Sequence, residues 1–126
     1  MKRIIAAAAL LVFSFTFAFI SNFMIINKMN GISEKLRSLN EALPSITADE
    51  LNKRTDEIIS EWKNSEWIIH AFINADSVSE TEKNLRMLGE LAKNGLTDEF
   101  AVYCTDTLTQ VESIRNSEKI SKENIF

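Results

Sequence analysis

The chain has 126 residues and a formal net charge of −4, which leaves room for one small domain and not for two. It contains three glycines and one proline. These are too few of the breakers that hairpins and sheets need, so the composition predicts an all-α fold. Beyond Lys2 and Arg3 the chain carries 12 basic against 18 acidic residues. A surface of this charge repels phosphate backbones and argues against nucleic-acid binding.

The most informative stretch is residues 4–26, IIAAAALLVFSFTFAFISNFMII, which contains no charged residue. As a helix it reaches about 35 Å at 1.5 Å per residue, and the hydrocarbon core of a bilayer is about 30 Å thick. A helix also satisfies its own backbone hydrogen bonds where no water is present. We therefore expect an N-terminal transmembrane anchor over residues 1–27 and an extracytoplasmic helical domain over residues 28–126.

Lys2 and Arg3 followed by an apolar run also describe a cleavable secretory signal. Thr16-Phe17-Ala18 is a poor small-x-small cleavage site, and the apolar run continues to Ile26, so we expect an uncleaved signal anchor. Basic residues stand on both sides of the segment, and their counts do not decide the orientation. Because a short basic start is typical of secretory-type anchors, we expect a single-pass protein of the cell membrane with a cytoplasmic N-terminus.

An apolar stripe with the spacing of one helix face continues beyond the anchor. Steps of four and three residues separate its members, which are Ile25, Met29, Ile32, Leu36, Leu39 and Leu43. The first helix of the domain is therefore expected to continue the membrane helix without a break. Pro44 is expected to end it.

A second helix is expected to begin at Thr47, which forms a capping box with Glu50. Its apolar stripe runs from Leu51 to Ile73 and includes Trp62. The segment WIIHAFI, residues 67–73, is apolar on nearly all sides. We expect this segment to be enclosed on more than one side, either as the centre of the bundle or as a contact surface.

Ser77 and Glu80 offer a capping box for a third helix, and Asn94-Gly95 supplies a left-handed stop for it. Short connections place consecutive helices antiparallel. The expected architecture is thus an N-terminal transmembrane helix that continues into an antiparallel, up-down-up-down four-helix bundle.

The fourth helix is expected from Thr97, and its apolar pattern is lost after residue 116. The tail that follows, SEKISKENIF, is expected to fray unless Ile120, Ile125 and Phe126 dock it.

Two tryptophans and a carboxylate–imidazole pair are the candidate ligand or partner contacts. Glu66 and His70 are four residues apart and hence neighbours on one helix surface. They could transfer a proton or sense pH, but we favour a hydrogen-bonded pair at the rim of the core. Trp62 lies on the core stripe and is expected in the core, whereas Trp67 faces away from that stripe and is the better interface candidate.

No catalytic, metal-ligating or cofactor-binding signature accompanies these residues. The chain has one histidine and no HExxH-like or calcium-loop spacing, so we expect no metal site and no cofactor. Cys104 is the only cysteine and cannot form an internal disulfide. Pairing between chains is open to it, but its apolar neighbours favour a buried core side chain.

Four features occur together in the chain: Trp62, the apolar run that ends in His70, Asp76 after it, and Glu118 followed by Asn124-Ile125. In these features the chain resembles a family of small bacterial proteins, the domain of unknown function 4363 family. The resemblance implies one N-terminal membrane segment, a helical remainder and a Gram-positive bacterial source, and it implies no activity. An anchor that leads into a four-helix bundle also looks like the sensory half of chemoreceptors.

These observations favour a non-enzymatic, membrane-anchored helical module of the bacterial cell envelope, acting in protein interaction or as a structural element. Its expected partners are the lipid bilayer and either another envelope protein or a second copy of the chain. The alternative is an extracytoplasmic sensor domain for a small ligand held between helices near Trp62 and His70.

Overall fold

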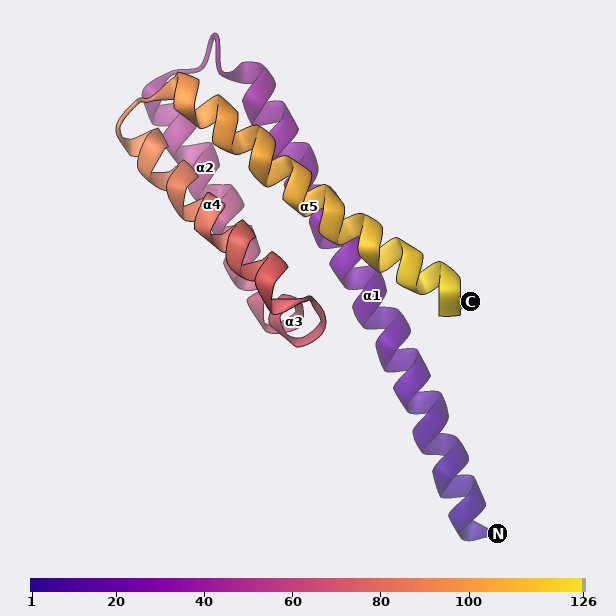
Figure 1. Ribbon diagram of the computed structural model, residues 1–126. Helices are drawn as coiled ribbons and strands as arrows, with labels where there is room; N and C mark the ends of the chain where they lie inside the picture. The colour runs from indigo at the N-terminus through magenta and orange to yellow at the C-terminus, as the bar shows by residue number, and fades with distance from the viewer. Residues whose placement is uncertain (126) are drawn as a thin grey trace.

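The structure is a computed structural model that describes the backbone of residues 1–125 and the side chains of residues 1–120. The described chain forms five helices and no strand: α1 (Lys2–Ala42), α2 (Ala48–Asn64), α3 (Glu66–Phe72), α4 (Ala75–Lys93) and α5 (Thr97–Ile125). α2 returns beside α1, α3 turns across the end of α2, and α4 and α5 run back and forth beside the first pair (Figure 1). The expected all-α class is confirmed.

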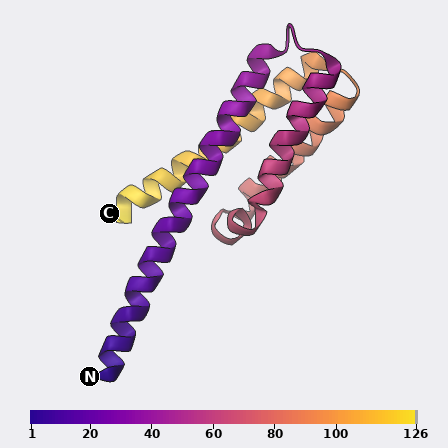
Figure 2. The same cartoon turned by 180° about the vertical axis from the view of Figure 1, so that it is seen from behind.

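α1 is a single helix with two different environments along its length. Residues 1–20, which we call the stalk, are exposed at every position, and the first buried residue is Ser21. Figures 1 and 2 show this part of α1 extending alone beyond the other helices. By length and composition, α1 is able to cross a membrane.

The remainder of α1 is the central helix of the core, as its apolar spacing predicted. Five residues of the stripe are 0% exposed: Ile25, Met29, Ile32, Leu36 and Leu39. Leu43 is partly buried and packs against them. The helix ends at Ala42, two residues before Pro44, because proline disfavours helical geometry in the residue before it.

α5 packs against α1 in the opposite direction, and polar pairs join α1 to residues 112–118 of α5. The pairs are Asn22 with Glu118, Asn30 with Arg115, and Arg37 with Glu112. Their order along α5 is the reverse of their order along α1. A shift of α5 by one residue separates all three pairs, so they fix the register of the antiparallel contact.

The C-terminal tail is helical and not frayed, since α5 continues to Ile125. Asn22 Nδ2 donates to Glu118 Oε2 at 2.7 Å and to the Glu118 backbone oxygen at 3.1 Å. Burial raises the pKa of Glu118, and the hydrogen bond from Asn22 acts in the opposite direction. Ile120 is exposed and does not dock the tail; the side chains of Ile125 and Phe126 lie outside the described residues.

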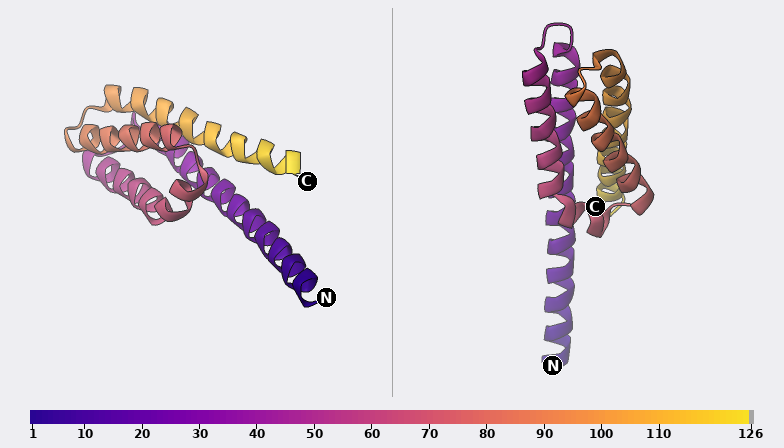
Figure 3. Two further views of the ribbon diagram at one scale, coloured as in Figure 1. Left: turned by 60° about the horizontal axis from the view of Figure 1, so that its bottom comes forward. Right: turned by 90° about the vertical axis from the view of Figure 1, so that its left-hand side faces the viewer.

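The second helix breaks at Ser65, where the apolar stripe predicted one continuous helix. The Ser65 hydroxyl donates to the Glu61 backbone oxygen at 3.1 Å, and its backbone N–H bonds to the Trp62 oxygen at 3.0 Å. A serine hydroxyl competes in this way with the regular helix ladder. The chain restarts as the seven-residue α3, which lies across the end of α2 (Figure 3).

Two of the predicted helix boundaries are confirmed, and the predicted start of α4 is wrong. The Thr47 hydroxyl accepts from the Glu50 N–H at 3.2 Å and caps α2 as expected. Gly95 has φ 68° and ends α4 in the left-handed conformation. The Ser77 cap is wrong, because α4 begins at Ala75 and the Asn74 side chain accepts from the Asp76 N–H at 2.8 Å.

Cys104 is a buried core residue, as expected. Its thiol donates to the Leu36 backbone oxygen at 3.4 Å, and burial raises its pKa from 9.0 to about 11. The thiolate is the reactive form. We therefore predict that Cys104 does not react with a maleimide at neutral pH until guanidinium unfolds the protein.

A matched control places the thiol on the neighbouring exposed position, in the double variant Cys104→Ala with Thr105→Cys. This thiol is expected to react without denaturant, because Thr105 is exposed. If maleimide reacts equally fast with the folded wild type and the folded double variant, the burial of Cys104 is contradicted.

Candidate functional site

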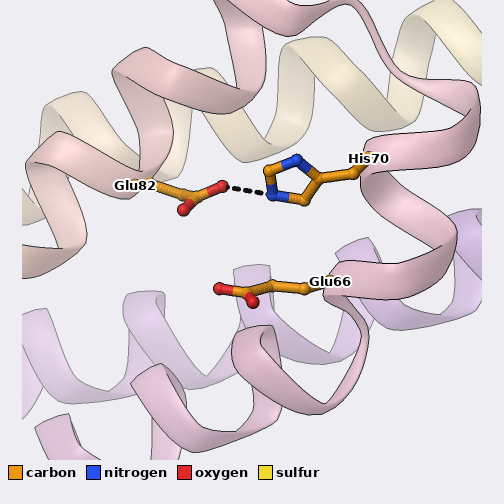
Figure 4. A group of neighbouring side chains, drawn as sticks. All are labelled: Glu66, His70 and Glu82. Carbon is orange, nitrogen blue, oxygen red and sulfur yellow. Dashed lines mark hydrogen bonds and ion pairs between the residues drawn. The ribbon is translucent and has the colours of Figure 1, made fainter.

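The four candidate residues lie in or beside α3, at the end of the bundle from which the stalk emerges. Trp62, one turn before α3, is 2% exposed and belongs to the core, as predicted. Trp67 is 64% exposed, which agrees with its predicted position away from the core stripe. Glu66 and His70 project from α3 toward α4 (Figure 4).

His70 forms its hydrogen bond with Glu82 of α4, not with Glu66. The distance between His70 Nε2 and Glu82 Oε1 is 2.7 Å. The Glu66 carboxylate points toward the same pair (Figure 4), and one ligand atom from each of the three residues lies within 4.8 Å of the others. The predicted Glu66–His70 hydrogen bond is therefore replaced by a contact between helices.

This cluster of Glu66, His70 and Glu82 offers one imidazole nitrogen and two carboxylates, a donor set that suits divalent zinc or a similar ion. The His70 side chain is exposed and Glu82 is partly buried, so water competes for both. The hydrogen bond between them accounts for their position without an ion. The absence of a metal site stays a prediction.

A shallow groove of about 480 Å³ lies next to the cluster, between α2 and α4. Acidic and basic side chains share its walls: Asp56, Glu66, Glu82, Glu90, Lys63, Arg86 and Lys93. Trp62 also contributes to the lining. Its indole Nε1 is buried and has no hydrogen-bond partner among the described residues. The groove suits a small polar ligand better than an apolar one.

α3 is enclosed on one side only. Its sequence, apolar on nearly all sides, predicted that it would be enclosed on more than one side. Ile68 and Ile69 are buried in the core, whereas Trp67 and Phe72 are exposed. The Phe72 ring lies 6.0 Å, centroid to centroid, from the ring of Phe17 in the stalk. The C-terminal end of α3 thus contacts the apolar surface of the stalk through Phe72.

In the comparisons with known proteins, no family model, no curated protein and no solved structure matches this chain. The resemblance to the domain of unknown function 4363 family stays a prediction. The site is therefore interpreted from its own geometry.

Glu82→Gln removes the carboxylate charge that faces His70 and keeps the size of the side chain. We predict that it lowers the free energy of unfolding by about 1 kcal/mol or less, because the pair is partly solvent-exposed. Zinc ions are predicted to leave the melting temperature of the wild-type protein unchanged. Thermal unfolding followed by circular dichroism, with and without zinc, measures both effects.

The control is Glu57→Gln, an exposed glutamate on α2 outside the cluster. A zinc-dependent rise in melting temperature that the Glu57 variant keeps and the Glu82 variant loses contradicts the prediction, and identifies the cluster as a metal centre.

Proposed function

We propose that this protein is a non-enzymatic, membrane-anchored helical module of the bacterial cell envelope. Its N-terminal anchor, residues 1–27, spans the cell membrane once with a cytoplasmic N-terminus. Its up-down-up-down bundle lies outside the cytoplasm, where it binds an envelope protein or a second copy. The observation that carries the proposal is the division of α1 into an exposed apolar half and a buried half.

The exposed half supports an anchor because its apolar area needs a cover. Large side chains along the stalk are largely exposed, among them Leu10, Phe13 and Phe17. A soluble monomer rarely exposes a continuous apolar patch of this extent. Residues 4–26 carry no charge, and a helix of this length satisfies its own backbone groups inside lipid. A bilayer therefore covers the stalk in the proposed state.

The buried half supports a compact module that the stalk holds close to the membrane. The core residues of α1 pack against α2, α3 and α5. Many charged side chains on the bundle surface are in ion pairs or hydrogen bonds between helices, such as Lys35 with Glu61 at 2.6 Å. These pairs link neighbouring helices at the surface of the bundle, which suits a module that presents a fixed surface to a partner.

The alternative function is a sensor domain for a small ligand, and the groove favours it. A ligand carrying a hydrogen-bond acceptor and both charges could use the groove's acidic and basic walls. Trp62 also lines this groove. A ligand that binds there is expected to change the fluorescence of Trp62.

We predict that the full-length chain stays in the membrane fraction after an alkaline carbonate wash, with a mass that includes residues 1–18. Leu11→Arg is predicted to weaken this retention, because a charge at the centre of a spanning helix costs about 3 kcal/mol. Leu11→Phe is the matched control. A mature chain that begins after Ala18, or that the wash releases, contradicts the anchor.

Cross-linking in intact cells tests the binding role. We predict that mass spectrometry recovers one recurrent cross-linked species, either a second copy or one envelope protein, attached through the bundle. Recovery of the monomer alone, with the protein present in the membrane, counts against the binding role and leaves the anchor in place.

A further inference from the structure

The stalk by itself is shorter than the hydrocarbon layer that the proposed anchor, residues 1–27, crosses. Its uncharged part, residues 4–20, reaches about 25 Å at 1.5 Å per residue, against about 30 Å for the hydrocarbon core. The next turn of α1 must therefore also lie at the boundary of that layer. The bundle already packs against this turn, since Ser21 and Ile25 are buried.

At this level α1 has a lipid-compatible side and a bundle side. Phe23 and Met24 are exposed apolar residues, whereas Ser21 and Ile25 face the bundle. The same helical turn carries both sides. If lipid covers Phe23 and Met24, the end of the bundle that packs on Ser21 and Ile25 must therefore lie at the bilayer surface. Exposed side chains at this end of the bundle then meet lipid headgroups.

α3 is the element presented there (Figures 1 and 3). Trp67 and Phe72 are 64% and 43% exposed, and among the described residues outside α1 they are the exposed large aromatic side chains. Both belong to this one seven-residue helix. Phe72 contacts Phe17, which lies about one helical turn before Ser21 in α1. The C-terminal end of α3 is therefore level with the last turns of the stalk.

The chemistry of α3 fits the boundary between headgroups and acyl chains. Ile68 and Ile69 hold one side of the helix in the core, and Trp67 lies on the opposite side at about 100° per residue. Phe72, the last residue of the helix, lies between the two isoleucines in angle and is exposed at the end of α3. Tryptophan is enriched at this boundary because its ring is apolar and its N–H is polar. Amphipathic helices whose apolar side carries Trp, Phe or Leu lie parallel to the surface there.

We infer that α3 is a second membrane contact, which inserts Trp67 and Phe72 into the interfacial region of the bilayer that the stalk crosses. This inference rests on the proposed anchor. The occupant beside Trp67 and Phe72 is phospholipid, since Phe72 contacts Phe17 of the stalk and both aromatic residues are exposed at the end of the bundle from which the stalk emerges. Two contacts restrict the tilt of the bundle, which a single spanning helix leaves free.

The two tryptophans allow a direct test in the full-length chain. The Trp62→Phe variant reports on Trp67, and the Trp67→Phe variant reports on Trp62. Each is reconstituted into phosphatidylcholine vesicles with and without acyl chains brominated near the headgroup. Trp67 is expected to lose about half of its emission, because bromine quenches a ring that contacts lipid at the interface. Trp62, at 2% exposure, is expected to change little.

A control at the other end of the bundle separates lipid contact from simple exposure. Val102, near the start of α5, is 63% exposed. Val102→Trp in the Trp62→Phe, Trp67→Phe background therefore matches the exposure of Trp67 away from the stalk. Its emission is expected to be unaffected by brominated lipid.

The quenching and carbonate-wash results test the α3–lipid contact and the membrane anchor separately. Vesicles that keep the protein through a carbonate wash but show no quenching of Trp67 overturn the α3 contact and leave the anchor intact. Quenching of the Val102→Trp control to the same degree also overturns it. Loss of the protein in the wash overturns the anchor. If Trp62→Phe does not fold, the difference between wild type and Trp67→Phe gives the emission of Trp67.

Discussion

The structure depends on the continuity of α1, because one helix is both the stalk and the central element of the core. Its buried stripe sets where α2, α3 and α5 pack. The polar pairs with α5 fix the register of the longest contact. No loop separates the exposed half from the buried half. The bundle therefore has a defined position relative to the stalk. The depth to which α1 is inserted in the bilayer then sets the distance between the bundle and the membrane.

The break at Ser65 produces the charged cluster and the exposed aromatic residues at the end of the bundle from which the stalk emerges. It turns α3 out of the direction of α2, and this brings His70 to Glu82 of α4. The same turn leaves Trp67 and Phe72 on the outside of the bundle. Had α2 continued as one helix, its last turns would extend beyond the end of α4. One irregular residue thus generates both the charged cluster and the exposed aromatic surface.

The elements governed by local signals could be predicted from the sequence. The stripe from Ile25 to Leu39 follows the 3.6-residue period, and Thr47 and Gly95 carry the cap chemistry that their positions require. The break at Ser65 could not be predicted in this way, because the apolar residues after it keep the same helical period. The serine at that position was the one available signal.

The candidate site was less predictable, because its contacts come from packing between helices. The pairing of Glu66 with His70 follows from helix spacing, which assumes that each side chain prefers its nearest neighbour on the same helix. The structure offers His70 a closer partner on α4, and no local pattern marks Glu82 as that partner. The cap of α4 was also wrongly predicted: the structure uses Asn74, three residues before the predicted Ser77.

The continuity of α1 is tested most directly by a distance across its two halves. Spin labels on cysteines at Val12 and Glu41, in a Cys104→Ala background, report this distance by double electron–electron resonance in lipid. One uninterrupted helix predicts a single narrow distribution near 44 Å at 1.5 Å per residue. A broad distribution, or a distance well below this value, shows that the stalk bends away from the core helix and contradicts the account.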